Sequence, residues 1–315
     1  MDYQEAKELL ACLPEERTLY SYCHDQYAVD LLRIASRRHR SIQELKGSRY
    51  AQLLAKPAIS SLMRSCGNGH LDNRVLDTFW QEPGTTYLLT AGLWDARGGR
   101  YAQTSRPGAN LVLRLNFNLQ HDKLFQQSMR PDYPCAFNGW GHPFLRHGER
   151  AYFRETLAWA RLDIDLATDE VLVEEVQSDW ARHINWLQKR VAHYPSDDAQ
   201  IWSRNYCSTA AQVRNYLAFC EPLIRDWNQA MLAAVVNFID RELGVSRIWY
   251  HTWETGALLK GIDRHWAPPT SLYRQLPKKF CFEETGDMPG FLSGRSMRKK
   301  LNRHKLAPRF YQLEL

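Results

Sequence analysis

The sequence lacks any apolar run of about 18 residues, so no segment is predicted to span a membrane. Its first residues are acidic and amphipathic and do not have the layout of a signal peptide. The seven cysteines are an odd number, are scattered along the chain and include no Cys-x-x-Cys pair. This usage argues against a disulfide framework and a zinc ribbon, and it predicts a reduced, cytoplasmic protein.

A strong charge bias is missing as well. Lys and Arg number 41 and Asp and Glu 35, so the net charge is +6, which does not by itself indicate a nucleic-acid partner. There is no low-complexity tract, and 44% hydrophobic and 24% charged residues are globular values. With 11 Trp, 15 Tyr and 12 Phe among 315 residues, the chain can fill the core of one large domain or two ordinary ones.

Residues 1–84 are predicted to form a helical N-terminal region. Apolar residues recur at helical spacing from Tyr27 to Ile34, and Ser41 with Glu44 matches a capping box. No catalytic constellation is visible there, so we interpret this region as a cap or an interaction domain.

Residues 85–315 are predicted to form an α/β domain with a basic C-terminal segment, and α+β is the alternative class. The clearest local signal is a β-hairpin, in which two alternating stretches flank the turn at 167–170. Strands are expected at 85–90, 110–117, 156–166, 171–179, 245–251 and 280–284, helices at 180–194, 210–220, 222–244 and 254–262, and a turn or helix at 271–278. This order predicts a mixed sheet with flanking helices, in which the strands at 171–179 and 245–251 lie parallel.

The segment Val171–Trp180 reads V-L-V-E-E-V-Q-S-D-W. It resembles the E-E-[IV]-Q-S-D-W signature of a domain found in very large phage and prophage polyvalent proteins and in related stand-alone bacterial proteins. A helix at Trp227–Gly244, a strand end at Arg247–Glu254 and the segment Tyr273–Lys278 match the family in the same order. The chain departs from the family at Ala181–Trp186, where a glycine-containing basic loop is usual. The resemblance implies a phage-related origin and supplies no mechanism.

The order of elements is also similar to the second half of the GNAT acyltransferase superfamily. A tyrosine near the last helix of that superfamily often protonates the leaving thiolate, which implies Tyr273 as a catalytic acid and acetyl-CoA as the acyl donor. A glycine-rich turn there offers backbone N–H groups to the donor's pyrophosphate. Gln177–Arg182 stands in its place here and contains no glycine.

Four polar residues end the second hairpin strand: Glu174, Glu175, Gln177 and Asp179. Strict alternation places Glu175, Gln177 and Asp179 on the same face as Val173, and Glu174 on the opposite face. Carboxylates buried close together at a strand end can act as acid and base. Alternatively, this face is solvated and Asp179 caps the helix that follows.

His251, Thr252 and Glu254 end the strand that is expected to lie beside the signature strand. They would then approach Gln177 and Asp179, and His251 could act as a general base near neutral pH. The alternatives are a half-buried histidine among aromatic residues and a helix cap formed by Thr252 and Glu254.

The predicted catalytic set is Glu175, Asp179, His251 and Tyr273, and the predicted substrate-binding set is Glu174, Gln177, Trp180, Thr252, Glu254 and Lys278. Asp179 and His183 could share a metal, but no third spaced ligand and no H-E-x-x-H motif appears, so no metal site is predicted.

A basic segment at 295–309 could contact nucleic-acid phosphates or an acidic protein partner. Its predicted contact residues are Arg295, Arg298, Lys299, Lys300 and Arg303. The alternative is a solvated helix face. The sequence thus supports two hypotheses: a GNAT-like acyltransferase with an unknown acceptor, and a non-catalytic protein- or nucleic-acid-binding module of mobile-element origin.

Overall fold

The fold is taken from a computed structural model. It describes residues 1–13, 18–64, 66, 69–71, 73–77, 79, 84–95, 103–133, 135–138, 142–145, 154–203, 205–262 and 269–315.

An eight-stranded mixed sheet forms the centre of the described chain, in the order β1-β2-β3-β4-β5-β8-β10-β9. The strands are β1 (Thr18–Tyr22), β2 (Thr85–Asp95), β3 (Ala109–Asn116), β4 (Thr156–Asp165), β5 (Glu170–Gln177), β8 (Arg247–His251), β9 (Glu283–Thr285) and β10 (Phe310–Glu314). Neighbouring strands are antiparallel, except that β5 and β8 are parallel. The predicted α/β class, the hairpin and the parallel pair are therefore confirmed.

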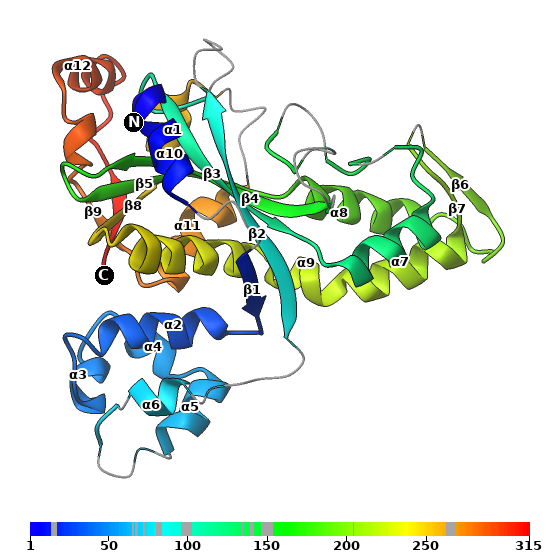
Figure 1. Ribbon diagram of the computed structural model, residues 1–315, viewed down its shortest axis with the longest axis horizontal. Helices are drawn as coiled ribbons and strands as arrows, with labels where there is room; N and C mark the ends of the chain where they lie inside the picture. The colour runs from blue at the N-terminus through cyan, green and yellow to red at the C-terminus, as the bar shows by residue number, and fades with distance from the viewer. Residues whose placement is uncertain are drawn as a thin grey trace.

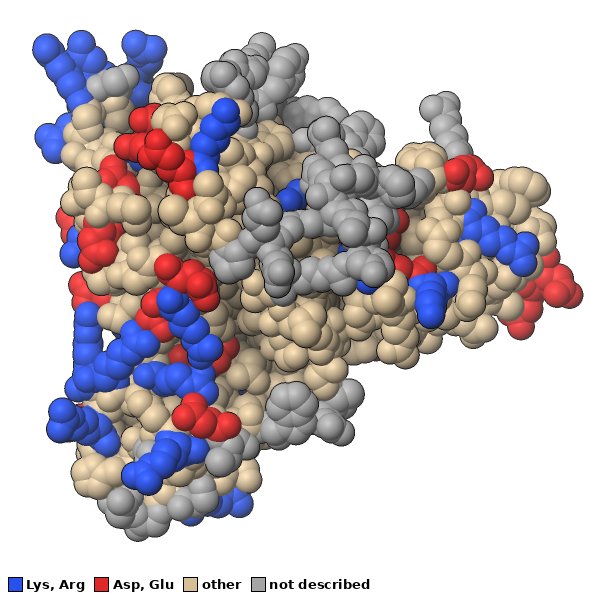
Figure 2. Space-filling model, in the orientation of Figure 1, with Lys and Arg blue, Asp and Glu red and all other residues tan. Residues whose placement is uncertain are grey.

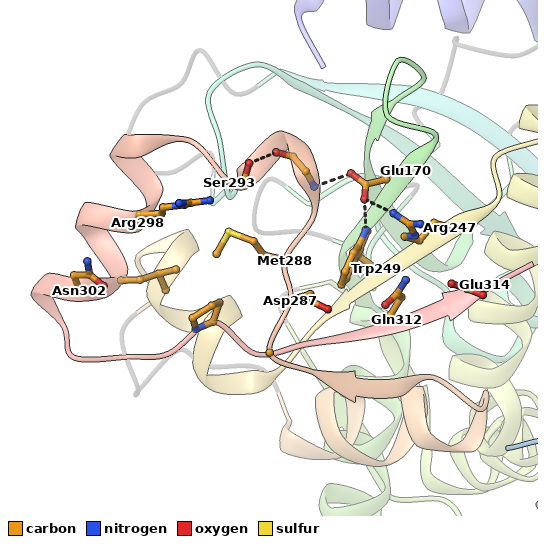
Figure 3. Close-up of a pocket in the computed structure, with 14 residues that line it drawn as sticks. Glu170, Arg247, Trp249, Asp287, Met288, Ser293, Arg298, Asn302, Gln312 and Glu314 are labelled. Carbon is orange, nitrogen blue, oxygen red and sulfur yellow. Dashed lines mark hydrogen bonds and ion pairs between the residues drawn. The ribbon is translucent and has the colours of Figure 1, made fainter.

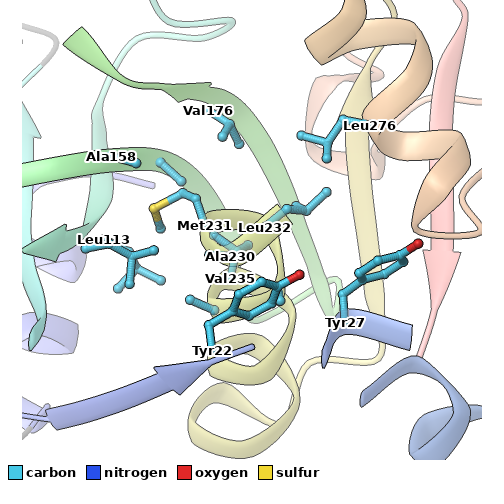
Figure 4. Close-up of a cluster of buried hydrophobic side chains, with 14 of the residues drawn as sticks. Tyr22, Tyr27, Leu113, Ala158, Val176, Ala230, Met231, Leu232, Val235 and Leu276 are labelled. Atoms are coloured by element: carbon cyan, nitrogen blue, oxygen red, sulfur yellow. The ribbon is translucent and has the colours of Figure 1, made fainter. Parts of the chain in front are cut away.

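One face of the sheet is covered by the helices α7 (Leu119–Met129), α8 (Asp179–Val191) and α9 (Ala210–Phe238) (Figure 1). Every second residue of a strand points to this face, so β3 and β4 bury Leu113 and Ala158 against Met231 and Val235 of α9 (Figure 4). The opposite face carries a smaller apolar cluster beneath α10 (Trp253–Lys260) and α12 (Arg295–Arg303). It comprises Leu172, Trp249, Leu259, Leu292, Leu301 and Phe310.

The long helix α9 differs from the expectation of two helices separated at Pro222. Pro222 lies inside one continuous helix, whose start is a capping box made by Thr209 and Gln212. Proline costs a helix one hydrogen bond, but Cys220 and Leu223 are buried on either side of it, so packing holds the helix together. A π-helical turn at Ile239–Leu243 then ends at Gly244, whose φ of 63° suits the predicted glycine cap.

The N-terminal region is helical except for β1. After α1 (Tyr3–Cys12), β1 pairs with β2 at the edge of the sheet. The helices α2 (Gln26–Ala35), α3 (Ile42–Lys46), α4 (Ala51–Leu54), α5 (Pro57–Arg64) and α6 (Asn73–Asp77) then form a lobe beside α9 (Figure 1). The predicted capping box at Ser41 and Glu44 is present. Because α1 and β1 pack with the sheet, they belong structurally with the α/β part rather than with the lobe.

Besides β1, three short strands were not predicted. β10 lies between β8 and β9, and β6 (Gln200–Trp202) and β7 (Cys207–Thr209) form a separate hairpin. The helix α11 (Thr270–Lys279) lies where a turn or helix was expected.

Candidate active site where two parallel strands diverge

A β-bulge in β5 sets the geometry of the site. Arg161 of β4 lies opposite Glu175 and Leu162 lies opposite Val173, so Glu174 is an extra residue without a partner in this ladder. Val173 and Val176 both belong to the core beneath α9. The two glutamates between them therefore leave the core together, and the prediction that they occupy opposite faces is wrong.

The parallel pairing of β5 and β8 is short. It runs from Glu170 with Arg247 to Val173 with Tyr250, and stops where the bulge begins. The two strands diverge beyond this point, at their carboxyl ends. In open α/β sheets this end of a parallel pair is where ligands bind.

Glu174 accepts hydrogen bonds at this divergence. Its carboxylate accepts from the backbone N–H of Ser105 at 2.9 Å, from the Ser105 hydroxyl at 2.9 Å and from Nε2 of His251 at 3.1 Å. Glu174 and His251 are fully buried and Ser105 is nearly so. The Ser105 hydroxyl also lies 2.9 Å from Nε2 of His251. The Ser105 hydroxyl and the Glu174 carboxylate thus contact the same ring nitrogen of His251. In a nucleophilic serine triad they would contact different nitrogens of the ring.

The protonation of this cluster follows from its contacts. Burial acts to raise the pKa of Glu174, but the hydrogen bond from His251 and the charge of Lys260 outweigh it and hold the pKa below its usual range. Burial lowers the pKa of His251, against the hydrogen bond and the charge of Glu174, which act to raise it, and this direction favours the neutral ring. We assign the proton to Nε2, because Glu174 needs a donor there. Nδ1 is then a buried acceptor with no hydrogen-bond partner among the described residues.

Lys260 fills the gap between the diverging strands. Its ammonium donates to the carbonyl oxygen of Glu174 at 2.9 Å and to the hydroxyl oxygen of Tyr273 at 3.1 Å. Burial lowers the pKa of Lys260 and raises the pKa of Tyr273 well above its usual range. Tyr273 therefore keeps a proton that it can donate, beside a cation that can stabilise its phenolate.

Glu175 is paired with Arg161 at 2.5 Å, and both side chains are almost completely buried. Burial acts to raise the pKa of Glu175, but the charges of Lys260 and Arg161 lower it below its usual range. A carboxylate held in this way is a weak base. The ion pair with Arg161 fits Glu175 better than the predicted role of base. His251 is better placed for that role.

Gln177 and Asp179 continue the row of hydrogen-bonded polar side chains from Glu175 towards solvent. Both carboxylate oxygens of Asp179 lie within 2.9 Å of Nδ1 of His142. With its amide oriented to satisfy its neighbours, Gln177 donates to Glu175 at 2.9 Å and accepts from Arg182 at 2.7 Å. Ser178, and not Asp179, caps α8, because its hydroxyl accepts from the N–H of Ala181 at 2.9 Å.

A cavity of about 500 Å³ opens onto Asp179. Arg182, His183 and Trp186 of α8 line it, together with Tyr133 from the loop before β4. Burial lowers the pKa of His183 to about 4, and its ring stacks on Phe137 with centroids 4.0 Å apart. The cavity gives solvent access to Asp179, the outermost of these hydrogen-bonded polar side chains.

Other predicted site residues lie elsewhere. Trp180 is buried in the aromatic cluster beneath the sheet, where it donates to the hydroxyl of Tyr216 at 3.1 Å, so it cannot face a substrate at the divergence. Thr252 caps α10, as its alternative interpretation predicted. Glu254 pairs with Arg274 on the surface at 2.6 Å. Lys278 lines a different cavity, between α4 and α11.

A cavity of about 870 Å³ lies at the opposite end of the parallel pair (Figure 3). Its buried Glu170 accepts from Arg247 at 3.1 Å, from the Trp249 indole at 3.1 Å and from the N–H of Gly290 at 2.7 Å. These donors satisfy the carboxylate without a ligand. Because the cavity adjoins the amino ends of β5 and β8, it is separate from the divergence.

The basic segment forms α12 as an exposed helix that is anchored by Leu301 and by a hydrogen bond of 2.7 Å from Lys300 to the carbonyl of Leu259. Arg295, Arg298, Lys299 and Arg303 are exposed. Figure 2 shows that, on this face, acidic side chains lie between the cations of α12 and the Lys and Arg side chains in the lower part of the view.

Among the described residues, no three His, Cys, Asp or Glu side chains converge as metal ligands, and no helix has the length and apolarity needed to cross a membrane. Comparison of the chain with family models, curated proteins and solved structures finds no match.

Proposed function

We propose that the protein is a GNAT-like acyltransferase that moves an acyl group from a coenzyme A thioester to an acceptor not yet identified. The observation that carries the proposal is the hydrogen bond of 3.1 Å from the Lys260 ammonium to the Tyr273 hydroxyl oxygen, in the gap where β5 and β8 diverge. Further support comes from the order β4–β5, α8–α9, β8, α10–α11 and β9, which is the order on which the resemblance to the superfamily depends.

We propose a proton path that uses these contacts. Nδ1 of His251 accepts the proton of the acceptor's amine or hydroxyl as that group attacks the thioester carbonyl. The carbon–sulfur bond then breaks, and Tyr273 gives its proton to the departing thiolate. The ammonium of Lys260, 3.1 Å from the Tyr273 oxygen, stabilises the phenolate that is left. The proton on His251 can then return to the phenolate through solvent.

The reaction requires the gap to open. His251 is fully buried, Tyr273 is 2% exposed and Lys260 is 5% exposed, so the substrates reach these groups only when the gap widens while Lys260 keeps its contact with the Tyr273 oxygen. Lys260 ends α10 and is followed by Gly261, whose φ of 65° already lies in the left-handed region. We expect donor binding to change hydrogen exchange first at this end of α10.

The N-terminus of α8 is poorly suited to hold the donor's pyrophosphate. The hydroxyl of Ser178 already occupies one of its N–H groups, and Asp179 adds a negative charge in the first turn. A carboxylate in the first turn already uses the favourable potential of the helix N-terminus and repels a further anion there. We therefore expect the pyrophosphate to contact other groups.

Native mass spectrometry of the full chain with and without acetyl-CoA tests the proposal. A 1:1 adduct of coenzyme A mass that persists in Tyr273→Phe would support it, because the phenol acts in chemistry rather than in binding. No adduct at millimolar acetyl-CoA would overturn it.

The second candidate is a nucleic-acid- or protein-binding module, which the exposed cations of α12 favour. Salt-dependent binding of an oligonucleotide that weakens in Lys299→Gln, without any coenzyme A adduct, would support this candidate instead.

A further inference from the structure

A cationic cavity of about 510 Å³ lies between the N-terminal lobe and α11. Tyr27 of α2, Leu53 of α4 and, from α11, Arg274, Gln275, Lys278 and Lys279 line it. Tyr27 reaches from α2 towards α11 (Figure 4), and its ring stacks on Phe280 with centroids 4.7 Å apart. Gln52 donates to the carbonyl of Lys278 at 2.7 Å. These contacts fix the two walls relative to each other.

Four cations line this cavity: Lys56, Arg274, Lys278 and Lys279. Two of them have partners, because Lys56 pairs with the buried Asp25 at 3.0 Å and Arg274 pairs with Glu254 at 2.6 Å. Within the described part of the chain, no carboxylate pairs with Lys278 or Lys279. The cavity therefore has an excess of about two positive charges.

The fold holds two of these cations close together. The ammonium groups of Lys56 and Lys279 lie 5.7 Å and 5.6 Å from the centre of the same buried Tyr27 ring. The Tyr27 ring attracts both cations, but it does not cancel the repulsion between them. Burial and then the charge of Lys56 lower the pKa of Lys279, while Asp25 and Asp226 act in the opposite direction. An anion between them would relieve the repulsion.

We infer that this cavity binds a small phosphorylated anion through Lys278 and Lys279, with Lys56 and Arg274 as supporting cations. A phosphate monoester or pyrophosphate carries the two or more negative charges that match the unpaired lysines. Lysine binds phosphate as a point charge, and arginine can add a bidentate contact. The volume lies in the range of small-molecule sites, about 300–1,000 Å³. The inference is independent of the acyl-transfer proposal, because Tyr273 and Lys260 do not line this cavity.

Isothermal titration of the full chain with pyrophosphate tests the inference, and succinate serves as a dianion without phosphorus. We expect 1:1 binding of pyrophosphate and much weaker binding of succinate. Replacing Lys278→Gln and Lys279→Gln together should weaken binding by at least about tenfold, because two charge-assisted contacts are lost. Lys299→Gln removes an equally exposed charge from α12 and should change binding by less than about twofold.

A charge-retaining variant controls for folding. Lys278→Arg keeps the cation and should bind within about threefold of the parent chain. Absence of pyrophosphate binding at 10 mM would overturn the inference, as would equal binding of succinate. An equal loss in Lys299→Gln would also overturn it, because that result would show general charge attraction.

Discussion

Replacing Glu174→Gln tests whether this carboxylate organises the candidate site. The substitution preserves size but removes the charge that accepts three hydrogen bonds from Ser105 and His251. A glutamine can accept through one oxygen only, and its amide group then faces donors. A hydrogen bond to a charged group contributes about 1.5–3 kcal/mol, so losing one and weakening another should lower the free energy of unfolding by about 3 kcal/mol.

Urea unfolding at pH 7, followed by tryptophan fluorescence, measures this loss. Glu283→Gln on β9 is the matched control, since its side chain is 66% exposed and its pair with Arg49 is worth at most about 1 kcal/mol. Ser105→Ala should cost less than Glu174→Gln, and the double variant should show coupling of about 1 kcal/mol. If Glu174→Gln unfolds within about 0.5 kcal/mol of the parent, Glu174 is not the charged centre of this cluster.

Three further substitutions test other parts of the site. The pKa of His183 is about 4 in the fold and 6.5 ordinarily, so unfolding takes up a proton between these values and stability falls as pH falls from 6.5 to 4. This loss is about 3 kcal/mol. Urea unfolding at pH 7 and pH 4 measures it, and we expect His183→Gln to abolish it. If the free energy of unfolding falls by the same amount in the parent chain and in His183→Gln, the assignment is refuted. Glu175→Gln removes the carboxylate that pairs with the buried Arg161 and should cost about 3–5 kcal/mol by calorimetry, whereas a cost below about 1 kcal/mol would show that the pair is dispensable. Asp179→Asn should leave the affinity for coenzyme A unchanged in titration calorimetry, and a gain above about threefold would place the pyrophosphate at α8.

The elements around the site could be predicted wherever the signal was local. Alternating apolar residues on both sides of the turn at 167–170 identified β4 and β5, and helical spacing with a terminal glycine identified the end of the π-helical turn that follows α9. The parallel arrangement of β5 and β8 followed from the helix between them. β10 was missed as a strand because its five residues form one only by insertion between β8 and β9.

The arrangement of side chains in the site could be predicted only in part. Glu174 and His251 were candidates, but one bulged residue changed which glutamates share a face, and a bulge depends on the partner strand rather than on the local pattern. Ser105 and Lys260 belong to no motif and reach the site through tertiary packing alone. Trp180 lies next to the polar residues in sequence, but the start of α8 turns it into the core.

The most direct test of the proposed function is thiol release from acetyl-CoA in the presence of a panel of amines and alcohols. The account predicts that the parent chain releases thiol faster than buffer with at least one acceptor, and that Tyr273→Phe lowers the rate by about 100-fold or more. Tyr311→Phe is the control, because Tyr311 is a buried tyrosine on the neighbouring β10, is 3% exposed and lies outside the proposed proton path. Equal rates for the parent chain and Tyr273→Phe, or no release by the parent chain, would contradict the account.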